Sequence, residues 1–468
     1  MQSKAFLPPS FLAAMDAIMP SGLSREDFAA ACQRPLRKAI RVNTLKINVA
    51  DFQARMAPKG WQLSPIPWCE SGFWVARDDE SKMLGNEPEH QLGLFYVQEA
   101  SSMMPPTALW HVLEGQAQKV LDMAAAPGSK TTQLAALMQN GGVLVANELS
   151  SSRLKSMAAN IQRLGVANVA LSHFDGRVFG NALPETFDAI LLDAPCGGEG
   201  TIRKDADALK NWSQSHIDEI SALQQQLLAS AFSALKVGGV LAYSTCTLNR
   251  QENQHVLDSL IKAHPGKVEV LSLEGLFEGA HKALTEEGYL HIWPQIYDSE
   301  GFFVAAIKKT GSVESEPPGF KLGKFPYQSA PKKVAEAFGH YLAEQFGFTQ
   351  PLNLWQREQT LWHFPKAGEA LIGRFRMDRL GIKVAEQAGK EWRLHQDFIQ
   401  AFGQHCHSIA LSLEEASEFL KGRDIARDTP AGGEQLVSLE GYPLGSVKVI
   451  KNKLKNRLPR ELVKDQGL

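Results

Sequence analysis

Residues 96–309 alternate strand-like and helix-like segments, and this alternation limits the fold more than any other feature of the sequence. Residues 119–123 are predicted to form a buried strand, a turn of small residues follows, and residues 130–138 are predicted to form a helix before a second strand at 143–147. Alternating strands and helices are typical of a mostly parallel sheet with helices on its faces. We therefore predict an α/β domain at the centre of the chain.

The same pattern continues beyond the second strand. Ser150 can cap a helix whose apolar residues recur every three or four positions as far as Gly165. A long helix is predicted from about 215 to 235, and the Gly238-Gly239 pair is a helix stop signal. Further strands are predicted at residues 169–172, 187–192, 240–244 and 301–308.

The rest of the chain is predicted to form smaller units around this domain, because 468 residues are too many for one compact domain. The N-terminal part mixes helical stretches with short aromatic strands such as 72–76, which indicates a small α+β module. Residues 312–333 are rich in Pro, Gly, Ser and charge, which predicts a linker or a loosely packed connection. We expect four regions, at residues 1–95, 96–309, 320–386 and 387–468.

Charge gives little information at the level of the whole chain, since the formal net charge is only −2. Affinity for an acidic polymer would have to come from local basic patches. The clearest such stripe runs from Lys448 to Leu468, with seven lysines and arginines against two acidic residues. It is either a solvated tail or a surface that contacts phosphates.

Several classes of protein are disfavoured. The apolar stretches are too short to span a membrane, and prolines and Asp16 interrupt the first 22 residues where a secretory signal needs a continuous apolar core. We therefore expect a soluble cytoplasmic protein. None of the five cysteines forms a Cys-x-x-Cys pair, and His405-Cys406-His407 cannot face one ion on a helix, so we expect neither a disulfide framework nor a metal site.

The first strand, turn and helix of the central region have the layout of a nucleoside-cofactor site. Glu148 ends the next strand, 20 residues after Gly128, where an acidic side chain can accept hydrogen bonds from ribose hydroxyls. Asp175 follows the third strand, where a carboxylate could accept a hydrogen bond from an adenine amino group. The turn lacks the Gly-x-Gly-x-x-Gly pattern that holds a pyrophosphate, so a cofactor without phosphates fits better than NAD.

Two cysteines end neighbouring strands. Asp193-Ala-Pro-Cys196 follows the fourth strand and Ser244-Thr-Cys246 follows the fifth. Parallel strands bring their carboxyl ends to one edge of the sheet, so both thiols and Asp193 are expected beside the cofactor. The alternatives are that each cysteine is a small buried apolar residue or that the two form a redox pair.

With these residues in view, the chain resembles a known family, the RNA cytosine-C5 methyltransferases related to the nucleolar NOL/NOP/Sun proteins. Within that family it is most similar to bacterial enzymes of 16S ribosomal RNA, whose C-terminal extension is similar to a PUA-type RNA-binding module. The resemblance is carried by Arg41-Val-Asn-Thr-Leu-Lys46, Tyr96-Val-Gln-Glu-Ala-Ser-Ser102, Asp122-Met-Ala-Ala-Ala-Pro-Gly-Ser-Lys130, Asp193-Ala-Pro-Cys-Gly-Gly198, Ser244-Thr-Cys-Thr247 and Gly301-Phe-Phe-Val304.

The resemblance implies a Rossmann-like methyltransferase core with S-adenosylmethionine as cofactor, and it implies roles for individual residues. Cys246 would be the nucleophile, and Cys196 would assist product release. The sequence departs from the commonest family pattern at Met123, Ser129 and Gly197, where Cys, Gly and Ser are more usual. The expected cofactor-binding residues are Ala124, Ala125, Ala126, Pro127, Gly128, Ser129, Lys130, Glu148, Asp175 and Asp193.

The chemistry explains why such residues are needed. Carbon 5 of cytosine is a poor nucleophile, and a thiolate that adds to C6 makes C5 enamine-like if N3 is protonated or hydrogen-bonded. We expect Asp193 to carry that proton, because burial beside an uncharged ring favours the neutral acid. Lys130 is a candidate for activating Cys246. The base must also be unstacked, and the candidates for holding the RNA phosphates are Arg37, Lys38, Arg41, Arg203, Lys204 and the basic tail.

The sequence thus predicts a monomeric enzyme that makes 5-methylcytosine in 16S ribosomal RNA, presented within the small ribosomal subunit. Chain spacing alone does not choose between the two cysteines as the attacking group. Methylation of another RNA, such as transfer RNA or 23S ribosomal RNA, and a non-catalytic role in RNA binding and assembly stay open as alternatives. A DNA or protein methyltransferase is a further alternative.

Overall fold

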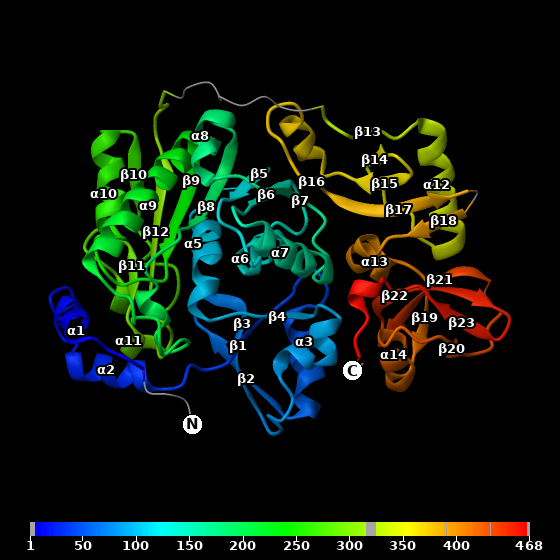
Figure 1. Cartoon of the computed structure of the whole chain (residues 1–468), viewed down its shortest axis with the longest axis horizontal. Helices are drawn as coiled ribbons and strands as arrows, with labels where there is room; N and C mark the ends of the chain where they lie inside the picture. The colour runs from blue at the N-terminus through cyan, green and yellow to red at the C-terminus, as the bar shows by residue number, and fades with distance from the viewer. Residues whose placement is uncertain are drawn as a thin grey trace.

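The computed structural model describes residues 5–465 except 114, 116, 315–323, 390 and 431. Four β-sheets organise these residues (Figure 1). The largest sheet forms the central domain, a four-stranded sheet lies below it in the view of Figure 1, and two five-stranded sheets near the C-terminus form the right-hand side.

The central sheet has a parallel core with antiparallel additions. Its order is β10-β12-β9-β8-β5-β6-β7-β16, and β11 pairs with β12. Strands β5 to β9 are parallel to one another, while β10, β11, β12 and β16 pair with their neighbours in antiparallel. The strands are β5 Lys119–Asp122, β6 Val143–Asn147, β7 Val169–Ser172, β8 Phe187–Asp193, β9 Leu235–Thr245, β10 Val268–Leu271, β11 Leu290–Ile292, β12 Phe302–Lys309 and β16 Arg379–Leu380.

The direction in which the chain adds strands reverses at β5, in the middle of the sheet. From β5 the chain adds β6 and β7 on one side and then β8 and β9 on the other. In open α/β sheets the ligand crevice lies at the carboxyl ends of the two strands where the order reverses. Asp122 ends β5 and Asp193 ends β8, so both carboxylates stand at this crevice.

Alternating side chains of the strands build two apolar layers. Leu121 and Ile190 belong to the core that α8, α9 and α10 cover, whereas Val120 and Leu191 belong to the core that α5, α6 and α7 cover. A strand buried on both faces needs apolar residues at successive positions, which is the pattern of β5 to β8. The helices are α5 Met104–Val112, α6 Ser129–Leu137, α7 Ser151–Arg163, α8 Phe179–Ala182, α9 Gln214–Ala234 and α10 Gln254–Ala263.

The predicted elements of this region are confirmed, with differences at their ends. Helix α9 passes directly into β9 at Leu235, so the Gly238-Gly239 pair lies inside the strand and does not stop the helix. Ser150 occupies the N-cap position of α7, but its side chain makes no capping hydrogen bond. Instead, Oε1 of Glu148 accepts a hydrogen bond from the Ser150 amide at 2.8 Å.

The N-terminal region is α+β, as predicted, but its parts pack in two places. Its sheet has the order β2-β3-β1-β4, and β4 extends past the expected boundary at residue 95. Helices α1 and α2 pack away from this sheet, where Phe11 and Phe28 contact the core around Trp293. The elements are α1 Pro9–Asp16, α2 Arg25–Gln33, β1 Ala39–Val42, α3 Val49–Met56, β2 Trp61–Ile66, β3 Cys69–Arg77, α4 Pro88–Gln91 and β4 Phe95–Val97.

The two C-terminal sheets have the orders β13-β14-β15-β17-β18 and β19-β21-β22-β23-β20. The first contains β13 Gln328–Ser329, β14 Leu354–Arg357, β15 Thr360–His363, β17 Ile382–Ala388 and β18 Glu391–Leu394, with α12 Lys332–Phe346 beside it. The second contains β19 Ser408–Leu411, β20 Ile425–Ala426, β21 Gly433–Leu439, β22 Tyr442–Ile450 and β23 Lys453–Asn456, with α13 Gln396–Phe402 and α14 Leu413–Leu420.

The connection to these sheets is packed more tightly than its composition predicted. Residues 315–323 of the expected linker lie outside the described residues, but Tyr327 is buried in the central-domain core together with Trp362 and Phe364. The ring of Phe375 lies 4.8 Å from that of Phe179, between centroids. The first C-terminal module therefore shares a core with the central domain.

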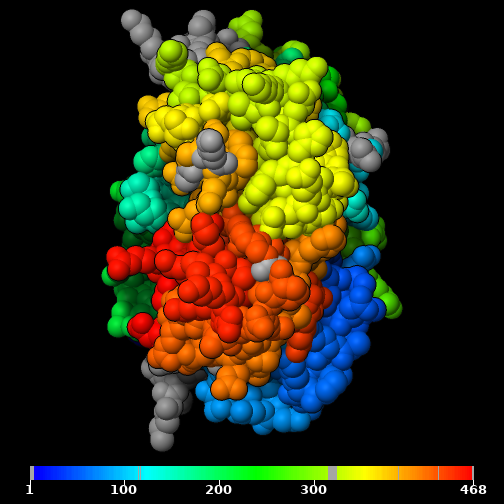
Figure 2. Space-filling model, turned by 90° about the vertical axis from the view of Figure 1, so that its right-hand side faces the viewer, coloured from blue at the N-terminus to red at the C-terminus, as the bar shows by residue number. Residues whose placement is uncertain are grey.

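The second C-terminal sheet contacts the N-terminal region as well, and the two surfaces meet in the space-filling view (Figure 2). The ammonium of Lys46 is buried and donates to Oε1 of Gln400 at 2.6 Å. Burial lowers the pKa of Lys46 to about 7. Asp397 at the start of α13 pairs with Arg379 of β16 and also accepts a hydrogen bond from Gln162 of α7.

No helix among the described residues is long and apolar enough to cross a membrane. Across the same residues, no group of three or more His, Cys, Asp or Glu side chains is arranged to hold a metal ion.

Candidate active site

The turn between β5 and α6 is shaped by small residues. Gly128 has a φ of 98°, a conformation that favours glycine, and it is the N-cap residue of α6. The Glu148 carboxylate is buried against this turn, where Oε2 accepts a hydrogen bond from the Ala126 amide at 3.2 Å. Arg153 donates to the Ala126 carbonyl at 2.6 Å. Glu148, which follows β6, and Arg153 of α7 therefore hold the turn in place.

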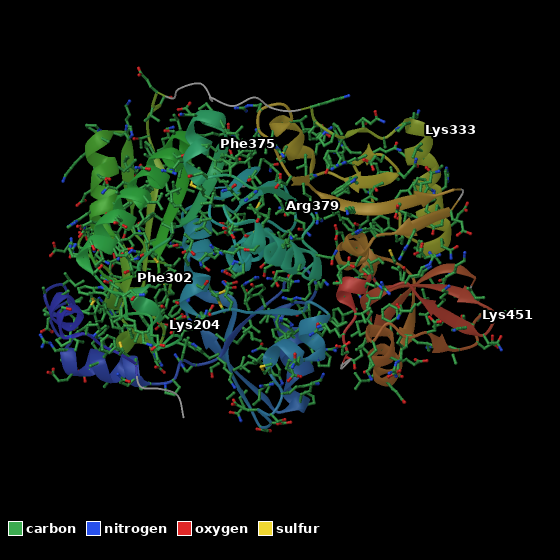
Figure 3. All side chains as sticks on the ribbon, viewed as in Figure 1. Lys204, Phe302, Lys333, Phe375, Arg379 and Lys451 are labelled. Atoms are coloured by element: carbon green, nitrogen blue, oxygen red, sulfur yellow. The ribbon has the colours of Figure 1, made fainter. Side chains whose placement is uncertain are left out.

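A cavity of about 530 Å³ opens beside this turn at the carboxyl edge of the sheet. Figure 3 labels two of its residues, Lys204 and Phe302, at the lower end of the central domain. Eight of the predicted site residues line it, namely Ala124, Ala125, Ala126, Pro127, Ser129, Lys130, Asp193 and Cys246. The other lining residues are Tyr96, Val97, Glu99, Ser101, Ser102, Arg153, Thr201, Lys204, Glu300 and Phe302.

The two strand-end cysteines are in contact. Their Sγ atoms lie 3.0 Å apart, and the Cys246 amide donates to Sγ of Cys196 at 3.2 Å. The hydrogen bond with Cys246, together with burial, raises the pKa of the Cys196 thiol well above its usual value. Cys196 is therefore a thiol near neutral pH. Cys246 lines the cavity, and Cys196 lies behind it.

Lys130 and Asp193 form an ion pair at the same edge. Lys130 Nζ lies 2.7 Å from Oδ2 of Asp193 and donates to Ser102 Oγ at 3.0 Å. Ser244 donates to the other oxygen, Oδ1, at 2.7 Å. Burial alone would lower the pKa of Lys130, but the charge of Asp193 raises it above its usual value. Lys130 is thus a cation at neutral pH.

Four predicted site residues do not line this cavity. Gly128 ends the turn, Glu148 is buried against it, and Cys196 lies behind Cys246. Asp175 accepts hydrogen bonds from the Arg177 side chain and backbone, and the bond from Arg177 lowers the pKa of its carboxyl.

The wall of the cavity fits a nucleoside cofactor that carries a positive centre. Residues 124–126 are alanines, whose side chains leave the space beside Cys246 and Asp193 open. The wall carries the carboxylates of Glu99, Asp193 and Glu300, and Asp122, which ends β5 outside the lining, has one buried oxygen, Oδ1, with no hydrogen-bond partner among the described residues. The residues present therefore fit S-adenosylmethionine, whose positive sulfonium the wall carboxylates can face.

Two of the predicted phosphate-binding residues are buried, which contradicts that prediction. Arg41 is 1% exposed and donates to Gln98 and Thr132, so it holds the N-terminal sheet against α6. The Arg203 side chain is also buried and donates to the carbonyls of Pro35 and Ser299. Composition cannot distinguish such structural arginines from solvent-facing ones.

The basic C-terminal stripe is partly neutralised within the protein. Lys448, Lys453 and Arg457 pair with Glu391, Asp424 and Glu434 respectively. Lys451, at the exposed turn between β22 and β23, stands at the edge of the molecule (Figure 3). Together with Lys455 and Arg460, Lys451 remains a candidate for phosphate contact.

Sequence reasoning missed several acidic residues at the site. Glu199 and Glu252 are buried beneath the two cysteine loops, and Glu300 lines the cavity. Glu199 and Glu300 directly adjoin motif glycines, which was the available signal, whereas Glu252 lies five residues beyond the motif that ends at Thr247. Their roles depend on loop conformations that the spacing does not specify.

Comparison with known proteins agrees with this geometry. The model of the 16S rRNA methyltransferase RsmB/F family matches residues 111–308, and that of the N-terminal domain of 16S rRNA methyltransferase RsmF matches residues 7–100. The pre-PUA domain of ribosomal RNA small subunit methyltransferase F matches residues 329–402, and the RsmF PUA domain matches residues 406–464. The predicted fold class, with a PUA-like extension, is confirmed.

Relatives that match over the whole length of the chain are named as ribosomal RNA small subunit methyltransferase F. The chain is 53% identical to ribosomal RNA small subunit methyltransferase F of Klebsiella pneumoniae, over 100% of this chain and 98% of that protein. It is 54% identical to the protein of that name in Aeromonas hydrophila, over the full length of both.

Solved structures match about two thirds of the chain. A methyltransferase homologue from Pyrococcus horikoshii is 37% identical over 65% of this chain and all of that chain, with a TM-score of 0.53. NSun6 from the same organism, solved with SFG, shares the fold at 22% identity over 65% of this chain and 99% of that one, with a TM-score of 0.56. This chain belongs to the ribosomal RNA small subunit methyltransferase F family.

Proposed function

We propose that this protein transfers a methyl group from S-adenosylmethionine to C5 of a cytosine in 16S ribosomal RNA. The observation that carries the proposal is the meeting of Cys246, Asp193 and Lys130 at one cavity, with Cys196 in contact with Cys246. The close relatives are named as methyltransferases of small-subunit ribosomal RNA, which supports both the reaction and the substrate.

The cofactor supplies an electrophilic methyl group, and residues 124–130 with Glu148 would hold it. The protein's own part begins with Cys246, whose thiolate adds to C6 of the cytosine and pushes electrons toward C5 and N3. Lys130, a cation in the same cavity, is the group that we assign to the activation of Cys246.

The charge that develops on N3 is met by the Lys130–Asp193 pair. The sequence pattern alone predicts a protonated Asp193, but in the structure its Oδ2 is paired with the ammonium of Lys130 at 2.7 Å. We therefore propose that Lys130 donates the proton to N3 and that Asp193 orients Lys130 for this transfer. Ser244 and Ser102 fix the pair in place.

Release of the product requires loss of the C5 proton, loss of the Cys246 sulfur from C6, and return of the N3 proton to Lys130. Cys196 is a thiol whose Sγ lies 3.0 Å from that sulfur. It can protonate the departing Cys246 sulfur, and the thiolate so formed can accept the C5 proton. One thiol thereby serves both proton transfers of the elimination.

RNA affinity is assigned to the C-terminal modules, at about 320–386 and 387–468, together with the exposed cations near the cavity. The family description of residues 406–464 as a PUA domain supports this part of the proposal. We further propose that the enzyme acts on the small ribosomal subunit or its RNA, since the relatives' names specify small-subunit RNA. We also propose that it is a cytoplasmic monomer.

Covalent trapping tests the nucleophile. With RNA that carries 5-fluorocytosine at the target, the C5 position cannot lose a proton, so the wild type should form a stable adduct with the cofactor present. Cys246→Ala should form none, and Cys406→Ala, which changes a cysteine remote from the cavity, should trap like the wild type. Equal trapping by Cys246→Ala would reject the assignment.

The role of Cys196 has its own test with ordinary RNA. Cys196→Ala should accumulate an RNA-bound covalent species, because methyl transfer proceeds and elimination slows. Normal turnover without accumulation would remove the role assigned to Cys196. Bisulfite sequencing of 16S ribosomal RNA from a deletion strain should show one cytosine that loses its mark, and an unchanged pattern would refute the substrate.

A further inference from the structure

A buried carboxylate lies between the loops that carry the two cysteines of the site. Glu199 is fully buried, and its Oε2 accepts hydrogen bonds from the amides of Leu248 and Asn249 at 2.9 and 2.8 Å. Oγ1 of Thr247 donates to the same oxygen at 2.8 Å. These donors belong to the three residues that directly follow Cys246. Glu199 therefore binds the chain on the C-terminal side of Cys246.

The segment that Glu199 binds has no regular secondary structure. Strand β9 ends at Thr245 and α10 begins at Gln254, so the amides of Leu248 and Asn249 have no partner within a sheet or a helix. A backbone N–H that is shielded from water needs an acceptor, and Glu199 supplies it for both residues. The conformation of this segment therefore depends on a side chain from another loop.

Residues 196–200 hold the backbone of Cys246 as well. The Cys246 amide donates to Sγ of Cys196 at 3.2 Å, and the Gly200 amide donates to the Cys246 carbonyl at 2.9 Å. Glu199 lies in the same loop and binds the residues that come next. One loop thus holds the backbone of Cys246 on both sides, and rotation of the side chain is the freedom that is left to its sulfur.

The second oxygen of Glu199 has a partner outside both cysteine loops. Oε1 accepts a hydrogen bond from Nε1 of Trp212, which precedes α9, at 2.7 Å. The two oxygens therefore serve different parts of the chain. Because of this separation, the bond to Trp212 can be removed without a change in the three bonds to the Cys246 loop.

We propose that Glu199 is a positioning residue that holds the Cys246 sulfur in the cavity by binding the three residues after Cys246. A displacement of about 1 Å in a reacting group can lower a rate about 100-fold, so an anchor of this kind matters to the attack on C6. The role in the reaction rests on the proposed function, because it takes Cys246 as the nucleophile. The anchoring of the segment does not.

Three variants separate this role from general packing. Glu199→Met fills a similar volume and removes every acceptor. Glu199→Gln keeps one acceptor oxygen, which the three donors of the Cys246 loop attract more strongly than the one donor of Trp212. Trp212→Phe removes only the bond to the other oxygen and is the matched control.

Two measurements are made on the full-length protein. Hydrogen exchange of the peptide that contains residues 246–250, without RNA or cofactor, should be about tenfold faster in Glu199→Met, because hydrogen bonds of the segment are lost. Covalent trapping by 5-fluorocytosine RNA with saturating cofactor should be about 100-fold slower in the same variant. The dissociation constants for RNA and cofactor should stay those of the wild type, and Glu199→Gln and Trp212→Phe should trap at nearly the wild-type rate.

A wild-type trapping rate in Glu199→Met would overturn the proposal, and so would an equal loss in Trp212→Phe or a loss explained by weaker binding of RNA or cofactor. If Glu199→Met does not fold, Thr247→Val decides, since it removes one donor of the loop and should slow trapping by about threefold to tenfold. An unchanged rate in that variant would then overturn the proposal. Absence of trapping in the wild type would reject the proposed function, while the exchange result would still test the anchoring.

Discussion

The carboxylates of Asp193 and Glu300 line the same cavity but have different surroundings. Asp193 has a cation at 2.7 Å, whereas Glu300 is 5% exposed and contacts the Ser101 hydroxyl. Burial raises the pKa of Glu300 to about 7, the charge of Glu99 adds to the rise, and Lys204 and Lys130 oppose it. Two acids in the wall of one cavity therefore have different electrostatic surroundings, because Asp193 is paired with a cation and Glu300 is buried near another acid.

Glu300 gives a prediction for stability against pH. Because its pKa is higher in the folded than in the unfolded protein, the folded state binds more protons between about pH 4.5 and 7, and stability falls as pH rises through that window. Above it the buried charge costs roughly 3 kcal/mol. Glu300→Gln should therefore be more stable than the wild type at pH 8, with the advantage vanishing near pH 4.5.

Urea unfolding at several pH values measures this difference. Glu99→Gln, which changes the more exposed acid beside Lys204, is the comparison and should show a much smaller pH-dependent gain. A stability difference between Glu300→Gln and the wild type that is the same at pH 5 and pH 8 would contradict the raised pKa.

Among the elements, the loops after β8 and β9 depend on a contact between two glycine backbones. A Cβ at Gly200 would lie 1.9 Å from the Gly301 carbonyl oxygen, and backbone cannot move aside as a side chain can. Gly200→Ala should therefore destabilise the protein by about 1–3 kcal/mol and reduce covalent trapping, because the Gly200 amide also holds the Cys246 carbonyl.

A second glycine provides the matched control. Gly339 lies on the exposed side of α12, and a Cβ there would meet nothing within 4 Å. Gly339→Ala should stabilise the protein by about 0.5–1 kcal/mol, because alanine favours the helix. Thermal unfolding and trapping assays compare the two variants. If Gly200→Ala behaved like Gly339→Ala, the close packing of Gly200 against Gly301 would be disproved.

The sequence predicted the strands and helices of the central domain because their apolar periodicity is local information. It also predicted that Cys196, Cys246 and Asp193 would meet, because parallel strands share a carboxyl edge. It could not predict the partners of Glu199 and Glu252, since these contacts join loops about 50 residues apart whose backbone conformations decide them.

At the scale of the whole molecule, the C-terminal modules are parts of the structure of the core and not appendages to it. Strand β16 extends the central sheet by pairing with β7, and Phe375 packs on Phe174 and Phe179. The composition of residues 312–333 predicted a linker or a loosely packed connection, but Tyr327 within it is buried in the core. The cavity and the proposed RNA-binding surface are consequently held in a fixed relation.

A truncated chain tests this integration. Residues 1–314 contain every residue assigned to the reaction, but without the C-terminal part the apolar faces of Phe174, Phe179 and Leu171 would lose their cover. Exposed apolar patches of this kind promote association. We expect residues 1–314 to aggregate or to bind a hydrophobic dye strongly. The control is the full chain with Lys451→Ala and Lys455→Ala, which changes only exposed cations. It should stay soluble and as stable as the wild type. Size-exclusion chromatography and thermal unfolding distinguish the cases. A monodisperse fragment with the thermal stability of the full chain would mean that the shared core contributes little, and the C-terminal modules would then act as a tether for RNA and not as a structural part of the catalytic domain.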